Sequence, residues 1–107
     1  MDLTREEALT LFRMMWTDMQ DELGDNPDYD QRCDYKEKWI NAKFPCRHVE
    51  NDCFLCEYVK FKDICSCKRC PIDWGATTCQ KYYIRGSVDW RYSPISEILA
   101  LPEREDV

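Results

Sequence analysis

The sequence predicts a small α+β protein in which an antiparallel N-terminal helix pair packs on a zinc-knuckle or zinc-ribbon module, followed by a short C-terminal helix. Three observations predict this fold. Residues 1–45 show helical hydrophobic periodicity with marked helix ends. Six of the eight cysteines fall within the 27 residues from Cys53 to Cys79. Ser93-Pro94 then opens a last apolar stretch.

We expect all 107 residues to form one domain, divided into a helical hairpin (1–45), a zinc-binding module (46–92) and a C-terminal helix with its tail (93–107). Neither an internal repeat nor a low-complexity linker indicates a boundary between domains. A chain of this size builds a modest apolar core, so a bound metal would add stability that packing alone does not supply.

Residues 4–23 are expected to form an amphipathic helix. Thr4 and Glu7 fit a capping box, in which each side chain accepts a hydrogen bond from the other residue's amide. Gly24 ends the helix, because glycine adopts the conformation common after a helix C-terminus. Apolar residues three and four positions apart predict a stripe that packs in the core, made of Ala8, Phe12, Met15, Met19 and Leu23.

A turn over residues 24–30 leads to a second helix over roughly residues 30–44. Asp30 is its expected cap, Pro45 ends it, and Trp39 is expected to dock on the first helix. A connection of this length favours an antiparallel pair. The expected inner side of the helix carries Cys33, Lys36/Glu37, Ile40 and Phe44.

Cysteine spacing predicts one structural zinc ion. Cys53/Cys56 and Cys67/Cys70 are two Cys-x-x-Cys pairs separated by ten residues. Two residues between thiolates let both sulfurs reach one metal, and two such pairs complete a tetrahedron. These four cysteines are therefore the first choice of ligands, with Cys79 as the expected replacement.

Neighbouring groups leave the ligand set open. Cys65 lies beside the second pair and His48 precedes the first, so either could take part. Disulfides or plain buried thiols are an alternative, which a reducing compartment disfavours, and a redox role for the Cys67–Cys70 pair is another, because nearby cations lower a thiol pKa. Cys33 and Cys46 lack a close-spaced partner, so we expect no second site.

The stretch after the second pair is expected to cover the metal and return to the helices. Ile72 and Trp74 are apolar side chains that would limit solvent access to the ligands. Residues 80–84 favour a strand, and Trp90 and Tyr92 are expected to pack back on the N-terminal helices.

A short last helix is expected after residue 92. Ser93 is the expected cap and Pro94 the first helical residue. Pro102 stops the helix, and residues 103–107 are expected to fray. Its expected apolar face comprises Ile95, Ile98, Leu99 and Leu101.

We expect a soluble, cytoplasmic protein without a membrane partner. The chain starts M-D-L-T-R-E-E, which lacks the basic start and apolar run of a secretory signal. No window approaches the roughly 20 apolar residues of a membrane span. A cytoplasmic setting keeps thiols reduced, which favours zinc over disulfides.

We expect no enzymatic activity. The chain has neither a Gly-rich phosphate loop nor a G-x-S-x-G elbow, and it has one histidine. His48-Val49-Glu50 fits half of the zinc-deaminase pattern, but Pro71 follows the Cys67/Cys70 pair, whereas that pattern places proline before it. Four thiolate ligands would leave zinc no open position for an activated water.

The net charge of −6 is uneven along the chain. Residues 1–52 carry −6, residues 53–92 carry +3 and residues 93–107 carry −3. Between residues 18 and 37 only Arg32 and Lys36 oppose eight carboxylates, which we call the acidic surface: Asp18, Asp21, Glu22, Asp25, Asp28, Asp30, Asp34 and Glu37. Such a surface can imitate phosphates and occupy a basic groove, although it can also be a solvated face that keeps the protein soluble.

The motifs resemble a family of small cysteine-rich proteins of bacteriophages and prophages of Gram-positive bacteria. The resemblance rests on the T-R-E-E-A opening, C-F-L-C-E-Y from Cys53, C-K-R-C-P-I-D-W-G from Cys67 and the closing L-P-E-R, and it covers nearly the full chain. It implies a phage-type intracellular protein, and the family carries no activity to transfer. Cys33, Cys46 and Cys65 depart from the family pattern.

The leading functional hypothesis is a zinc-binding protein-interaction module whose acidic surface binds a protein of the bacterial host. It would inhibit a host nucleic-acid-handling or defence system, as anti-CRISPR proteins do. The alternative is a zinc-ribbon regulatory protein that binds nucleic acid itself, with Tyr82 or Tyr83 for base stacking. Its cations would be Lys60, Lys62, Lys68, Arg69, Arg85 and Arg91.

Overall fold

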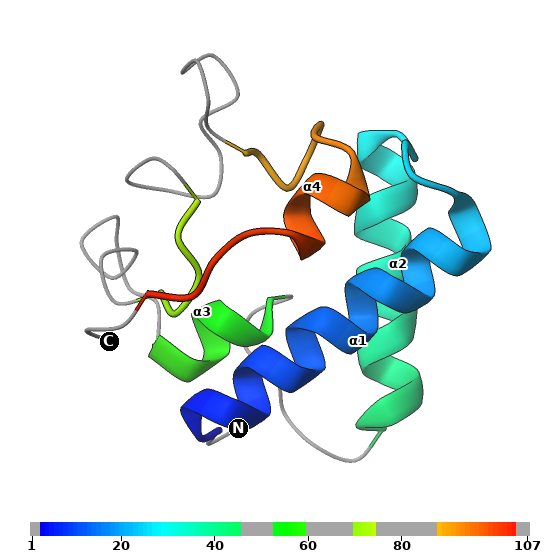
Figure 1. The fold of residues 1–107 in the computed structure, drawn as a ribbon. Coiled ribbons are helices and arrows are strands. Elements are labelled where there is room, and N and C mark those ends of the chain that lie inside the picture. Colours follow the sequence, from blue (N-terminus) through cyan, green and yellow to red (C-terminus); the bar gives the residue numbers. More distant parts are fainter. Residues whose placement is uncertain (1–2, 46–52, 60–69, 75–87, 105–107) are drawn as a thin grey trace.

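The computed structural model describes residues 3–45, 53–59, 70–74 and 88–104, which form four helices (Figure 1). Their bounds are α1 Arg5–Leu23, α2 Tyr29–Lys43, α3 Phe54–Val59 and α4 Ile95–Leu99. α1 is central, because each of the other three helices packs on it. None of the described helices is long and apolar enough to cross a membrane.

The expected α+β class is wrong for the part of the chain that the structure describes. Helices make up 62% of those residues, and no sheet occurs among them. Their one strand-like pairing is an isolated antiparallel bridge between Ile72 and Glu103. The expected strand at residues 80–84 lies outside the described residues. The expected zinc-ribbon module is not formed by the described residues either, because the first cysteine pair leads into helix α3, whose Phe54 and Leu55 are buried in the core.

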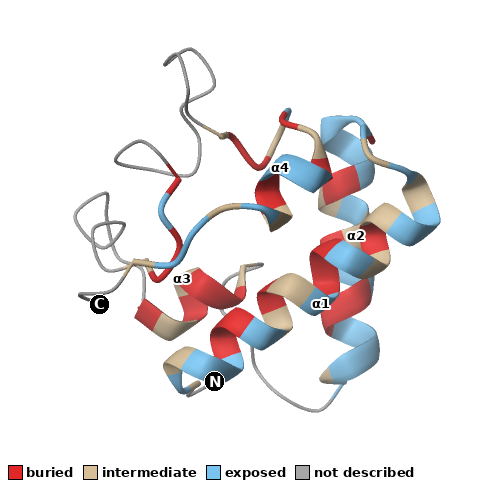
Figure 2. Ribbon diagram, viewed as in Figure 1, coloured by how far each residue is buried: buried red, intermediate tan, exposed pale blue. Residues whose placement is uncertain are grey.

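α1 follows the local rules of its sequence. The Thr4 hydroxyl accepts from the Glu7 amide at 3.1 Å, and the Glu7 carboxylate accepts from the Thr4 amide at 3.0 Å, so the predicted capping box is confirmed. Gly24 ends the helix with φ of 83°, a left-handed value that glycine tolerates. Burial follows α1 along its length (Figure 2), with Ala8, Leu9, Phe12, Met15, Trp16 and Met19 in the core.

α2 begins earlier than expected because its cap is Asp28, and the prediction of Asp30 is wrong. The Asp28 carboxylate accepts from the Gln31 amide at 2.8 Å, and the Gln31 side chain accepts from the Asp28 amide at 2.9 Å. This is the reciprocal geometry of a capping box with aspartate in place of serine. The predicted docking of Trp39 on α1 is confirmed, since its indole N–H donates to Asp18 at 2.8 Å.

The expected antiparallel pairing of α1 and α2 is wrong. Figure 1 shows α2 crossing α1 obliquely. The physical reason lies in the inner side of α2, which consists of Arg32, Lys36, Trp39 and Ile40. Two of these are cations that reach the segment 88–93, so α2 packs on that segment as well as on α1.

Arg32 joins α2 to the segment 88–93 through buried hydrogen bonds. Its side chain is 1% exposed. The guanidinium donates to the carbonyl oxygens of Pro27 at 2.9 Å, Trp90 at 2.9 Å and Ser93 at 2.7 Å. These bonds satisfy a charge whose burial would otherwise be costly.

Trp90 and Tyr92 both pack on α2, as the sequence predicts, but only Trp90 is buried. The Lys36 ammonium, itself 2% exposed, lies 3.7 Å from the centroid of the buried Trp90 ring. A desolvated cation over a tryptophan face is a favourable contact. Tyr92 is 51% exposed and lies beside Tyr29, with ring centroids 6.3 Å apart.

α4 is capped from a distant part of the chain, so the prediction of Ser93 as its cap is wrong. The Asp25 carboxylate accepts from the Ser96 amide at 2.6 Å and from the Ser96 hydroxyl at 2.8 Å. The Asp25 carbonyl accepts from the Ile95 amide at 2.9 Å. The Ser93 hydroxyl instead accepts from the Asp89 amide at 3.0 Å, within the preceding turn.

Replacing Asp25 by asparagine should reduce stability at neutral pH. The backbone amide and then the hydroxyl of Ser96, followed by the Gln20 amide, hold the pKa of Asp25 below its usual 3.8. A lowered carboxyl pKa stabilises the fold above pH 3.8, and this contribution is lost as the pH falls through the lowered value. We therefore expect the difference in urea midpoint between parent and variant to shrink below pH 4. Asp21→Asn, an exposed change on α1, is the control; an equal loss there, or a difference independent of pH, would contradict the role of Asp25.

The segment after α4 pairs with the segment after Cys70. The Asp73 amide donates to the Pro102 carbonyl at 2.9 Å, and the Arg104 amide donates to the Pro71 carbonyl at 2.7 Å. The expectation that the tail frays from Glu103 is therefore wrong for Glu103 and Arg104. The pairing places Ile72 and Trp74 in the core beside α1.

Candidate functional site

The structure brings Cys53 and Cys56 together at the start of α3. Cys53 precedes the helix and Cys56 lies in its first turn, so both thiols lie at the same end of it. A hydrogen bond from the Cys56 thiol, and then the positive charge of Lys36 and backbone amides of α3, lower the pKa of Cys53 to about 6 against the opposing effect of burial. A thiolate is the form that binds a metal. The two thiols of this Cys-x-x-Cys pair therefore lie close together, and the first of them ionises readily.

Cys70 is the third predicted ligand that the structure describes. Burial raises its pKa, and the charge of Cys53 raises it further, so the two thiols lie within electrostatic reach of each other. The Trp74 side chain acts on the pKa of Cys70 in the opposite direction. Ile72 and Trp74 are buried in the core, and their expected role as cover for a metal stays a prediction.

The zinc site itself stays a prediction. Cys67 and Cys79 lie outside the described residues, as do the alternatives Cys65 and His48. Within the described ranges, no group of three or more His, Cys, Asp or Glu side chains is close enough to hold a metal ion. None of the cysteines that the structure describes forms a disulfide. The thiols of Cys53, Cys56 and Cys70 therefore suit zinc chemically, although they do not by themselves form a site.

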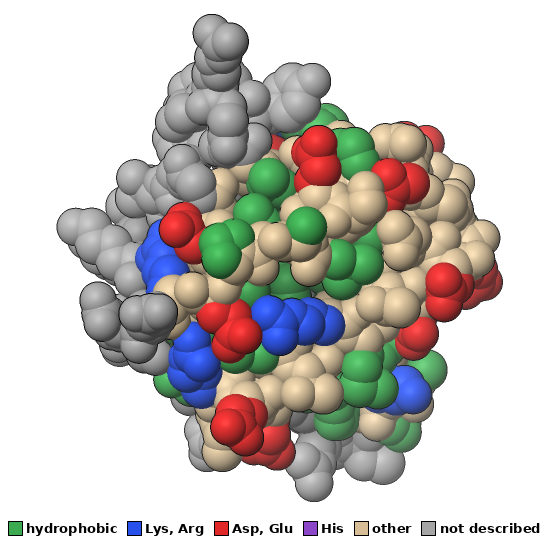
Figure 3. Space-filling model, viewed as in Figure 1, with side chains coloured by type: hydrophobic (Ala, Val, Ile, Leu, Met, Phe, Trp, Pro, Cys, Tyr) green, Lys and Arg blue, Asp and Glu red, His purple; other side chains and the backbone are tan. Residues whose placement is uncertain are grey.

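The eight carboxylates of the acidic surface are accessible to solvent, whereas the two basic residues of the same stretch are buried. All eight of its residues are exposed or half-buried, whereas Arg32 and Lys36, the two cations of the same stretch, are buried. Figure 3 shows acidic side chains at the end of the molecule where α1 leads into α2. The exposed charge of this stretch is consequently more negative than its composition indicates.

The eight carboxylates differ in what else they do, which the sequence alone does not reveal. Three of them accept a hydrogen bond within the fold: Asp18 from Trp39, Asp25 from Ser96 and Asp28 from Gln31. A fourth, Glu22, lies against the Tyr35 hydroxyl and acts on its pKa. The remaining four are exposed on the helices, and they are the ones that can be changed without breaking such a bond: Asp21, Asp30, Asp34 and Glu37.

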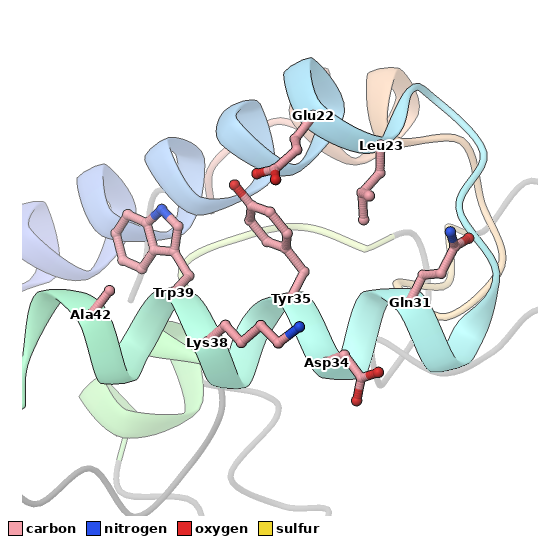
Figure 4. A pocket seen from close by; sticks show the side chains of 8 residues that line it. All are labelled: Glu22, Leu23, Gln31, Asp34, Tyr35, Lys38, Trp39 and Ala42. Atoms are coloured by element: carbon pink, nitrogen blue, oxygen red, sulfur yellow. The ribbon is translucent and has the colours of Figure 1, made fainter.

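A groove between α1 and α2 lies within the acidic surface (Figure 4). It has a volume of about 440 Å³. Glu22 and Leu23 line it from α1, and side chains between Gln31 and Ala42 line it from α2. We call it the α1–α2 groove.

The centre of the α1–α2 groove combines an aromatic ring with a carboxylate. Figure 4 shows the Tyr35 hydroxyl directed at Glu22. Burial, and then the interaction with Glu22, raise the pKa of Tyr35 to about 12. Sequence reasoning missed the groove. The signal that could have found it is the spacing of Tyr35, Trp39 and Ala42 along one side of α2, between acidic residues.

The cations expected to bind nucleic acid are mostly outside the described residues. Arg91 is the one that the structure describes. Its guanidinium donates to both oxygens of the buried Asp89 carboxylate, at 3.1 and 2.9 Å. Arg91 is therefore held by an internal ion pair, which does not favour a role in phosphate binding.

The resemblance to phage proteins stays a prediction. Comparison of the chain with protein-family models, with curated proteins and with solved structures finds no match. The functional proposal below takes its expected biological setting from the resemblance and its chemistry from the described side chains.

Proposed function

We propose that this protein is a phage-type, zinc-stapled interaction module whose acidic surface binds a basic nucleic-acid-binding protein of the bacterial host. Binding would occupy the partner's nucleic-acid site and inhibit it. The observation that carries the proposal is the burial of Arg32 and Lys36, which leaves no exposed basic side chain within residues 18–37.

The scaffold supports phosphate mimicry because six of the eight carboxylates lie on two capped helices, and Asp25 and Asp28 lie in the connection between them. Capping at Thr4 and Asp28 stabilises the starts of α1 and α2. Charges on ordered helices lose little conformational entropy when a partner binds. Opposite charge on a partner accelerates association, and salt weakens that attraction.

The proposed zinc is structural. Cys53, Cys56 and Cys70 would hold it, together with Cys67 or Cys79. Zinc bound by four thiolates supplies folding energy and leaves no coordination position for a reacting water. The metal would join α3 to the segment that follows Cys70, and we propose no catalytic step.

Reversing two carboxylates of the acidic surface tests the proposal. Asp21→Lys/Glu37→Lys should weaken capture of host nucleic-acid-binding proteins by about tenfold or more at low salt, because it turns attraction into repulsion. Neither residue accepts one of the structural hydrogen bonds above, so the fold should persist. The measurement is a pull-down from nuclease-treated bacterial lysate, with captured proteins released by added duplex DNA.

Glu6→Lys/Glu97→Lys is the matched control, because it changes the net charge equally at exposed positions outside the acidic surface. We expect it to capture the same proteins as the parent. Equal capture by the parent and by Asp21→Lys/Glu37→Lys, or capture that duplex DNA does not reverse, would show that the acidic surface is not the binding site.

A further inference from the structure

We infer that the α1–α2 groove is a pocket for an arginine side chain that projects from the basic surface of the partner. This inference rests on the proposed function, because it names the group that the acidic surface recognises. The groove offers both of the features that arginine uses, an apolar wall for its stem and a carboxylate for its guanidinium.

The apolar wall is formed by Leu23 from α1 together with Tyr35, Trp39 and Ala42 from α2. Leu23 and Tyr35 are half-buried and Ala42 is exposed. Apolar surface of these side chains is therefore accessible from the groove (Figure 4). Burial of an arginine stem against such a wall removes apolar surface from water. A short acidic side chain would bury little apolar surface against this wall.

Glu22 supplies the carboxylate. The Tyr35 hydroxyl points at it (Figure 4), and a carboxylate has about four acceptor sites. This contact leaves acceptor capacity for a planar guanidinium. Arginine fits better than lysine because its fork pairs with two carboxylate oxygens and its plane stacks on an aromatic ring.

The charges around the groove favour a cation. Glu22 and Asp34 line it against one ammonium, that of Lys38, and Asp18 and Asp21 lie near Tyr35 and act on its pKa. Figure 4 shows the Lys38 side chain stretched along α2 beside Tyr35. An incoming guanidinium would meet repulsion from Lys38, so loss of this ammonium should strengthen binding.

Two fluorescein-labelled peptides, nona-arginine and nona-lysine, test the inference by fluorescence anisotropy with the full chain. The parent should bind nona-arginine about tenfold more tightly than nona-lysine, since both carry the same charge and only one carries the planar fork. Lys38→Gln should tighten nona-arginine binding severalfold. Equal binding of the two peptides by the parent would overturn the inference.

Ala42→Leu fills the groove without changing any charge. Leucine is a good helix former, and Ala42 is exposed, so the helix should persist. We expect this variant to lose the preference for nona-arginine while it keeps salt-sensitive binding of both peptides. Asn41→Leu is the matched control, because Asn41 is the exposed neighbour on α2 and does not line the groove; it should bind both peptides as the parent does.

The outcomes separate this inference from the proposed function. Asp21→Lys/Glu37→Lys should weaken the binding of both peptides and keep the preference for nona-arginine. An arginine preference that survives Ala42→Leu would place the arginine elsewhere on a functional acidic surface. If Asp21→Lys/Glu37→Lys binds both peptides as tightly as the parent does, the proposed function itself is contradicted. Concentration-dependent dimerisation that Ala42→Leu abolishes would show that a second copy fills the groove, which would also overturn the inference.

Discussion

Replacing Cys56 by serine should prevent the chain from folding at neutral pH, and Cys53→Ser should do the same. Binding free energy in a structural zinc site is also folding free energy, on the order of 10 kcal/mol, which matches or exceeds the stability of a small domain. Circular dichroism and metal analysis of protein purified without chelator check this result. We expect one zinc per chain in the parent and a cobalt-substituted spectrum typical of four thiolates.

Cys33→Ser is the matched control, since Cys33 is a half-buried cysteine on α2 that we do not expect to bind the metal. It should fold and retain zinc. A parent protein that folds cooperatively without zinc, and whose Cys56→Ser variant melts at the same temperature, would rule out the metal site. A cobalt spectrum that reports an exchangeable bound water would contradict a closed, structural site.

Arg32→Met should reduce the free energy of unfolding by about 3 kcal/mol or more. The substitution keeps an unbranched apolar stem but removes the donors to Pro27, Trp90 and Ser93. Each buried carbonyl that loses its partner costs about 1–3 kcal/mol. Urea unfolding followed by tryptophan fluorescence measures the change, with Trp90 next to the altered site.

Arg13→Met is the comparison at the surface. Arg13 forms an ion pair with Glu103 at 3.4 Å, and both side chains are 42% exposed. Such pairs contribute about 0–1 kcal/mol because water screens them. If Arg32→Met and Arg13→Met unfold at the same urea concentration, the buried hydrogen bonds of Arg32 do not hold α2 to the segment 88–93.

The parts of the fold that the sequence predicts are those governed by neighbouring residues. The capping box of Thr4 and Glu7 and the stop at Gly24 depend on side chains within one helical turn of the backbone groups they serve. The inward stripe of α1 follows from periodicity in the same way. The adjacency of Cys53 and Cys56 needs only the spacing of a Cys-x-x-Cys pair.

The parts that the sequence does not predict depend on groups far apart in the chain. Ser93 is a plausible cap for α4 by local rules, but Asp25, 71 residues from Ser96, reaches the helix start instead. Arg32 and Lys36 belong to residue types that usually lie at the surface. They are buried because the carbonyls of Trp90 and Ser93 and the ring of Trp90 come within reach when α4 packs on α1.

The sequence by itself determined α1, the approximate extent of α2 and the presence of an acidic stretch. Only the tertiary structure decided which charges of that stretch face solvent, and hence where the α1–α2 groove lies. Periodicity indicates a helix but does not identify which charged side chain turns inward, because that choice depends on partners elsewhere in the chain. Burial of a cation is favourable only where carbonyls or an aromatic face replace its water, and those groups meet Arg32 and Lys36 only in the folded protein.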